Sequence, residues 1–210
     1  MTTRTSPDQA IARAQRALAQ ADPVLGRHMA KVGPFAIARN DVADLFVSLT
    51  EAIVYQQLSG KAAATIFARL QALSTRGSLT PDELLALDPA HIRGAGLSTA
   101  KSKAVLELAT RQRAGELPSV DEARALDDDV LIERLTAVRG IGPWTVEMLL
   151  IFRLGRPDVL PSTDYGIRQG FRKVFRSKDL PTPKQVLARG ERWRPHRTMA
   201  SWYLWRALGA

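Results

Sequence analysis

The residues Arg139-Gly140-Ile141-Gly142-Pro143 separate two apolar segments that have helical spacing. Two glycines around one apolar residue favour a tight turn, because glycine tolerates positive φ angles. Ile141 is expected to turn back into the core, and Pro143 suits the first position of the next helix. The unpaired backbone N–H groups and the positive helix end can then bind an anion, and a DNA phosphate fits. Alone, the pattern more often marks an ordinary turn between helices.

A carboxylate, Asp164, precedes the sequence Tyr-Gly-Ile-Arg, at the expected start of another helix. In isolation the simplest interpretation of Asp164 is an N-cap, which is worth about 1 kcal/mol without any catalysis. The positive end of the helix also keeps such a carboxylate ionised, so capping and a chemical role are compatible.

The net charge of +9 is concentrated in the last quarter of the chain. Residues 161–210 hold 11 basic and 3 acidic side chains, whereas residues 1–160 hold 19 and 18. This asymmetry favours a polyanion-binding surface over a merely solvated charged face. The chain has no cysteine, which excludes a disulfide scaffold, a thiolate zinc site and a cysteine-ligated iron–sulfur cluster.

The 210 residues suffice for one substantial domain or two small ones. The first residues lack the apolar stretch of a signal peptide, and no window approaches the roughly 20 apolar residues of a membrane span. We therefore expect a cytoplasmic, nucleoid-associated protein with no membrane partner.

Helical periodicity runs through nearly the whole chain, and no sustained alternation of period two predicts a strand. The fold class is therefore all-α, with about ten short helices. Ser98 is the expected N-cap of one of them. The helices are expected over residues 8–20, 41–58, 62–73, 81–87, 98–113, 127–138, 143–154, 165–175, 184–192 and 198–208.

Two segments carry a family resemblance, LTAVRGIGPWTVEMLLIF at 135–152 and PDVLPSTDYGIRQG at 157–170. Together they resemble the helix-hairpin-helix DNA glycosylase superfamily, in its DNA-3-methyladenine glycosylase II branch. The resemblance spans roughly residues 40–208. It implies two helical subdomains flanking a catalytic cleft, with Asp164 on one wall and Trp144 near the other. One subdomain would comprise residues 40–159, and the other would combine residues 1–39 with residues 160–210.

The resemblance makes Asp164 the catalytic residue of a DNA glycosylase in base excision repair. Such an enzyme hydrolyses the N-glycosidic bond of a damaged base flipped out of duplex DNA. Bond breaking builds positive charge on the deoxyribose, as in glycoside hydrolysis, and a fixed anion stabilises that charge. Asp164 would also orient or deprotonate the attacking water, or act only electrostatically. The branch implies alkylated substrates, 3-methyladenine and 7-methylguanine.

Aromatic residues match the family's base-binding pocket. Trp144 follows the hairpin, and Trp205 matches the tryptophan that stacks on the flipped base. The stretch Trp193-Arg194-Pro195-His196-Arg197-Thr198 resembles the family's WxP-x-R-[ST] motif, with Trp193 and Trp202 interpreted as core. An aromatic pocket favours a cationic alkylated base by about 1–2 kcal/mol. The substrate-binding candidates are Trp144, Trp205, Gln56, Tyr165 and Met148, the last in place of an aromatic residue of the related glycosylase.

DNA contacts are implied at the hairpin and at two other places. Gln57 would fill the gap left by the flipped base, or belong to a polar patch on a helix. The turn around Gly96, with Lys101 nearby, would hold a second phosphate or simply join two helices. The DNA-binding candidates are Gly140, Gly142, Thr145, Arg139, Gln57, Gly94, Gly96, Ser98 and Arg168.

Bifunctional relatives carry a lysine nucleophile two residues after the second hairpin glycine, where this chain has Trp144. The resemblance therefore implies base excision without strand cleavage. No cofactor is expected to be required. A Na⁺ or K⁺ ion at the hairpin would be held by the backbone carbonyls of Thr136, Val138 and Ile141. The expected partner is double-stranded DNA with a damaged base, bound by a monomer.

Two alternatives stay open at this point. The chain could be a glycosylase for another lesion, such as hypoxanthine or a mismatched pyrimidine. It could also be a DNA-binding module that kept the hairpin and lost the chemistry.

Overall fold

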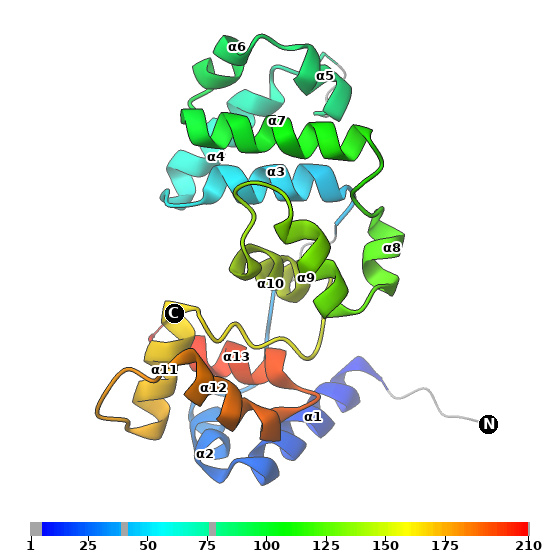
Figure 1. Cartoon of the computed structure of the whole chain (residues 1–210). Helices are drawn as coiled ribbons and strands as arrows, with labels where there is room; N and C mark the ends of the chain where they lie inside the picture. The colour runs from blue at the N-terminus through cyan, green and yellow to red at the C-terminus, as the bar shows by residue number, and fades with distance from the viewer. Residues whose placement is uncertain (1–5, 39–41, 76–78, 210) are drawn as a thin grey trace, which may run out of the picture. The chain divides into compact units, whose positions relative to one another are not determined.

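The protein is built from short α-helices, which the computed structural model describes over residues 6–38, 42–75 and 79–209 (Figure 1). The all-α prediction is confirmed, since these residues contain no strand. The elements are α1 (Pro7–Ala21), α2 (Pro23–Val32), α3 (Leu45–Tyr55), α4 (Gly60–Gln71), α5 (Pro81–Ala86), α6 (Pro89–Gly94), α7 (Thr99–Arg113), α8 (Val120–Ala125), α9 (Asp128–Thr136), α10 (Pro143–Phe152), α11 (Tyr165–Phe175), α12 (Pro183–Gly190), the 3₁₀-helix η1 (Glu191–Trp193) and α13 (Arg197–Arg206).

All ten expected helices are present, several with shorter ends, and three further helices were missed. The helix expected over 41–58 extends only from Leu45 to Tyr55, and residue 41 lies outside the described residues. The missed helices, α2, α6 and α8, have ten, six and six residues. The six-residue helices α6 and α8 give little periodicity. The N-caps Asp22, Asp88 and Ser119 mark the starts of all three.

Contacts divide the chain into two compact units. Unit 1 comprises Met1–Asn40 and Leu150–Ala210, and unit 2 comprises Asp41–Leu149. The second boundary of this contact division falls inside α10. The expected domain boundaries stay predictions, at 39/40, which lies outside the described residues, and at 159/160.

The core of unit 1 forms where α1, α2, α11 and α13 pack on one another. Leu18, Leu25, Phe171, Trp193 and Tyr203 are among its buried side chains. The buried carboxylate of Asp22 joins α2 to α12 and η1. Asp22 accepts two hydrogen bonds from Arg189, at 2.8 and 2.9 Å, and one from Trp193 Nε1 at 3.1 Å.

Unit 2 is organised around α7, against which α3 and α5 pack (Figure 1). Leu49, Ile53, Val105 and Leu108 belong to its fully buried side chains. Because α7 crosses most of this unit, its exposed and half-buried residues can reach several loops.

Among the described residues, no helix is long and apolar enough to cross a membrane.

Candidate active site and nucleic-acid interface

Asp164 is the N-cap of α11, as its position before Tyr165 predicts. Its Oδ1 accepts a hydrogen bond of 2.7 Å from the backbone N–H of Ile167. The side chain is half-buried. A cap in this position places a carboxylate at the positive end of the helix.

The same oxygen accepts a second hydrogen bond, from the indole N–H of Trp205 at 2.9 Å. Trp205 lies on α13, and its ring stacks on Phe152 with centroids 5.8 Å apart and an interplanar angle of 29°. Trp205 is therefore attached directly to the candidate catalytic carboxylate. Phe152 is the last residue of α10 and was not among the predicted site residues.

Two glycines on α11 allow α13 to approach this closely. A Cβ atom on Gly166 would lie 3.0 Å from Trp205 Cδ1 and 3.1 Å from Asp164 Oδ1. One turn further, a Cβ on Gly170 would overlap the backbone carbonyl of Leu204. The spacing of four residues puts both glycines on the face of α11 that meets α13. Sequence reasoning missed both, although that spacing was visible.

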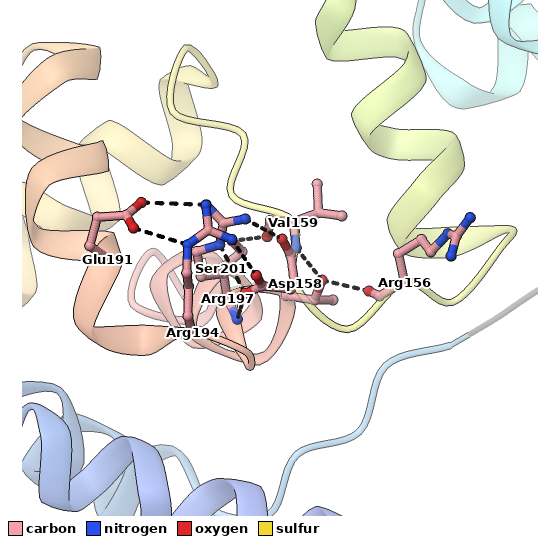
Figure 2. A network of polar contacts seen from close by, with 8 residues as sticks. Arg156, Asp158, Val159, Glu191, Arg194, Arg197 and Ser201 are labelled. Atoms are coloured by element: carbon pink, nitrogen blue, oxygen red, sulfur yellow. Dashed lines mark hydrogen bonds and ion pairs between the residues drawn. The ribbon is translucent and has the colours of Figure 1, made fainter. Parts of the chain in front are cut away.

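A polar network fixes the loop that leads to Asp164 against α13 (Figure 2). Arg197 donates from Nε to Asp158 Oδ1 at 2.9 Å and from Nη2 to the Asp158 carbonyl at 2.7 Å. Arg194 pairs with the other carboxylate oxygen of Asp158 at 2.7 Å and with Glu191 at 3.0 Å. Bidentate guanidinium contacts of this kind fix direction as well as distance.

Backbone groups of the same loop are held by hydroxyls of α13. Thr198 Oγ1 donates to the Arg156 carbonyl at 2.6 Å and accepts from the Val159 N–H at 3.0 Å. Ser201 Oγ donates to the Val159 carbonyl at 3.1 Å (Figure 2). Arg197 and Thr198 of the WxP-x-R-[ST] motif thus position the segment before Asp164, while Trp193 is fully buried. Trp202 is partly buried against the same core, as expected.

Tyr165 follows Asp164 and is the most exposed large aromatic residue of unit 1, with 64% of its surface accessible. Its hydroxyl is hydrogen-bonded by Gln169 Nε2. Arg168, a DNA-binding candidate, is half-buried and donates from Nε to the Pro181 carbonyl at 2.7 Å. In this arrangement Arg168 holds the loop between α11 and α12.

The hairpin in unit 2 has the expected shape. Gly140 has a φ of 80°, Ile141 is buried, and Pro143 is the first residue of α10. The Gly142 carbonyl accepts from Thr145 N at 3.0 Å and so begins the helix. Gly142 itself has no positive φ, and a Cβ there would meet nothing within 4 Å in the described part of the chain. Of the two hairpin glycines, only Gly140 has a backbone conformation that requires glycine.

Gln56 is attached to this hairpin. Its Nε2 donates to the Gly140 carbonyl at 2.7 Å, with Thr145 Oγ1 at 3.5 Å. Thr145 is buried, so its side chain supports Gln56 rather than facing outward. These contacts connect Gln56, Gly140 and Thr145. The side-chain amide of Gln56 thus donates to protein atoms.

The remaining candidates of unit 2 lie on exposed turns or beside the hairpin. Trp144 is 45% exposed, whereas Met148 is half-buried. Gln57 is exposed and has a φ of 57°. Arg139 is exposed and its N–H donates to Glu107 Oε1 at 3.3 Å.

The turn around Gly96 is compatible with both earlier interpretations, a second phosphate site and a simple turn between two helices. Gly96 has a φ of 110°, and a Cβ there would lie 3.0 Å from Ile66 Cγ1. Gly94 is exposed at the end of α6, and Ser98 caps α7 by accepting from Lys101 N. These features suffice for an interhelical turn, and the exposed backbone also leaves room for a phosphate.

Some of the basic charge lies away from Asp164. A hollow of about 750 Å³ in unit 1 is lined by Arg27, His28, Lys31, Lys173 and Arg176, with apolar residues and no acidic one. Lys173 and Arg176 lie at the C-terminal end of α11, about 16 Å along the helix from Asp164. Part of the charge of residues 161–210 therefore lies at the C-terminal end of α11, away from Asp164.

These features define a class. A model of the HhH-GPD superfamily base excision DNA repair proteins matches residues 50–195, most of the chain. The protein belongs to this superfamily, as the hairpin and Asp164 predicted.

Two relatives are similar to this chain over most of their own length. The chain is 43% identical to DNA-3-methyladenine glycosylase 1 of Schizosaccharomyces pombe over 162 residues, which are 77% of this chain and 71% of the relative. The solved structure of the S. pombe 3-methyladenine DNA glycosylase in complex with abasic DNA matches with a TM-score of 0.81 and 39% identity, covering 92% of this chain and 95% of that one. A DNA-3-methyladenine glycosidase of Bacillus halodurans matches with a TM-score of 0.85 and 32% identity, covering 98% and 90%.

Proposed function

We propose that this protein is a DNA glycosylase that removes alkylated bases, such as 3-methyladenine and 7-methylguanine, from duplex DNA. Its relatives with this name support the proposal. The observation that carries it is the carboxylate of Asp164, which caps α11 and is oriented by Trp205.

In the proposed reaction the bond between the base and C1′ of deoxyribose breaks first, and water then adds to the sugar. Positive charge develops on the sugar, and the ionised carboxylate of Asp164 stabilises it. Hydrogen bonds from the Ile167 N–H and Trp205 Nε1 fix the direction of this carboxylate. The carboxylate also orients or deprotonates the water. Alkylation on a ring nitrogen makes the base a better leaving group, so the protein need supply little acid catalysis.

The flipped base is proposed to lie against aromatic side chains. In unit 1, Tyr165 presents an exposed ring for this purpose, and Trp205 adds an electron-rich face next to Asp164. We propose Trp144, which is exposed in unit 2, as a further substrate contact. A cationic base gains about 1–2 kcal/mol from such faces over a neutral one. Met148 adapts to irregular shapes, and we propose that it widens the range of accepted bases.

DNA is proposed to bind through the hairpin, with backbone N–H groups on a phosphate and Gln57 in the gap left by the base. The missing side chain at Gly142 leaves space for that close approach. We further propose that the protein acts as a monomer in the cytoplasm. The carbonyls of Thr136, Val138 and Ile141 suit a hard cation such as Na⁺ or K⁺. That of Val138 already accepts the Ile141 N–H at 3.1 Å, which leaves one lone pair for an ion.

We propose that the strand is left intact. A lyase reaction through a Schiff base needs an amine beside the sugar, and Trp144 occupies the position from which relatives supply it.

The test is a panel of duplexes that carry 3-methyladenine, 7-methylguanine, hypoxanthine or a mismatched uracil, with released bases and nicked strands both measured. We expect release of the two methylated bases, with nicking only after alkaline treatment. Release of hypoxanthine or uracil alone would assign another lesion, and binding without any release would identify a DNA-binding module. Nicking without alkali would contradict the monofunctional proposal.

A further inference from the structure

One side of α7 contacts both DNA-facing loops of unit 2. Lys101, Ala104 and Glu107 follow one another at intervals of three residues, so they lie on adjoining parts of one side of the helix. We call residues 56–59, between α3 and α4, the wedge loop, and residues 139–142 the hairpin turn.

Lys101 holds the start of the wedge loop. Its Nζ donates to the carbonyl of Val54 at 2.7 Å and to the carbonyl of Gln56 at 2.6 Å. Val54 lies in the last turn of α3 and Gln56 is its C-cap. Carbonyls at a helix end lack hydrogen-bond donors within the helix. The ammonium group of Lys101 donates to them instead. Burial lowers the pKa of Lys101 below its ordinary value of 10.5, which agrees with an ammonium facing protein.

The next residue, Gln57, has the left-handed φ of 57°. This conformation costs a non-glycine residue about 1 kcal/mol or more, so it persists where neighbouring contacts impose it. The carbonyl of Gln56 belongs to the peptide group that Gln57 continues. By bonding this carbonyl, Lys101 fixes the direction in which the exposed Gln57 leaves the helix.

The hairpin turn is held by the same side of α7. A Cβ on Gly140 would lie 3.1 Å from the Cβ of Ala104, so the turn rests directly on α7. Glu107 accepts the N–H of Arg139 at 3.3 Å. The side chain of Gln56 connects the wedge loop directly to the hairpin turn by donating to the Gly140 carbonyl at 2.7 Å. The wedge loop and the hairpin turn therefore share one support.

We propose that Lys101 is a positioning residue that holds Gln57 at a fixed offset from the hairpin turn. The two elements then engage one duplex together, Gln57 in the base gap and the turn on a phosphate. The inference rests on the proposed function. Its physical basis is preorganisation, since a loop already held in its bound conformation loses less entropy when DNA binds. In this role Lys101 does not contact DNA, although it lies beside the exposed turn around Gly96.

The test compares Lys101→Met with Lys103→Met, which removes the same charge from an exposed site on the same helix. Affinities are measured by fluorescence anisotropy for an undamaged duplex and for one with a stable abasic analogue, at several salt concentrations. We expect the ratio of affinities for the abasic and the undamaged duplex to fall about tenfold in Lys101→Met. Its affinity for undamaged DNA and its salt dependence should match those of Lys103→Met. Lys101→Arg, which can donate to both carbonyls, should restore most of the preference.

Two results would overturn the inference. One is an unchanged preference in Lys101→Met. The other is equal weakening on both duplexes, with the slope of log affinity against log salt reduced by about one beyond the control, which is the behaviour of a phosphate contact. Should Lys101→Met not fold, Lys101→Gln keeps one donor and is judged by the same results. Because binding is measured without base release, a wild type that preferred the abasic duplex but released no base would contradict the proposed activity alone.

Discussion

The indole N–H of Trp205 donates a 2.9 Å hydrogen bond to Asp164 Oδ1, although 41 residues separate the two in the sequence. The same oxygen receives the N–H of Ile167. Trp205 was expected to stack on a flipped base, and its contact with Asp164 adds an orienting role. A hydrogen bond to a charged group contributes about 1.5–3 kcal/mol, so its loss should affect the rate of base release.

Replacing Trp205 by Phe keeps an aromatic face and removes the N–H. We expect the single-turnover rate of base release at saturating DNA to fall about 10- to 100-fold, because the carboxylate loses one of the groups that direct it. Trp202→Phe is the control, since Trp202 packs on Phe35 at the core. Equal rates in the two variants would show that the indole N–H has no part in the reaction.

The two glycines of α11 should separate activity from stability. Gly166→Ala places a methyl group against Asp164 and Trp205, and we expect about tenfold slower release with little change in the free energy of unfolding. Gly170→Ala meets the Leu204 backbone, which cannot yield easily, and should destabilise the fold by about 1–3 kcal/mol. Urea denaturation and release assays on both variants check this. A wild-type rate of release in Gly166→Ala would contradict this prediction.

Arg197→Lys tests the network around the loop before Asp164. Lysine keeps the charge but cannot reproduce the two-pronged contact with the side chain and carbonyl of Asp158. We predict a loss of about 1–2 kcal/mol of stability and a several-fold slower release. Arg192→Lys, at an exposed neighbouring position, is the matched control. A network without influence on Asp164 would leave the rate of Arg197→Lys unchanged.

Asp22 should control the acid stability of unit 1. Burial alone would raise its pKa, but hydrogen bonds from Arg189, Trp193 and the Leu25 N–H outweigh burial and hold the pKa below 3.8. A carboxyl group whose pKa is lower in the folded than in the unfolded protein stabilises the fold at pH values above its ordinary pKa. This contribution is lost as the pH falls through the folded pKa.

Asp22→Asn should therefore cost about 3 kcal/mol at pH 7, because it leaves Arg189 without its charged partner. The difference from wild type should shrink as the pH falls below about 4. Thermal melts from pH 7 to pH 3 measure both effects, with Asp121→Asn, at a site whose side chain is 96% exposed, as control. A difference that stayed constant over this range would show that the charge of Asp22 contributes nothing.

Local patterns predicted the helices and the hairpin well. The glycine with positive φ, the buried Ile141 and the caps Ser98 and Asp164 all depend on neighbours within four residues. The family resemblance then connected Asp164 to chemistry, which its N-cap position alone does not favour. The short helix α8 was missed because six residues give little periodicity, although its capping box was readable.

Partners far apart in the sequence were not predictable from one chain. Lys101 was interpreted as a neighbour of a phosphate, and its bonds to Val54 and Gln56 cross more than 40 residues. Phe152 ends the segment 135–152 but was not predicted as a site residue, and only the packing of α13 reveals its contact with Trp205. The charge asymmetry indicated a polyanion partner but not its location, since Lys173 and Arg176 lie at the end of α11 remote from Asp164.

The most direct test of the account is the single-turnover release of 3-methyladenine and 7-methylguanine from methylated duplex DNA by wild type and Asp164→Asn. Asparagine keeps the size and an acceptor for the Ile167 N–H but carries no charge. We expect wild type to release both bases, and the variant to bind an abasic duplex normally and to be slower by a factor of about 100 or more. A variant that released these bases at the wild-type rate would contradict the assignment of Asp164 as the catalytic carboxylate.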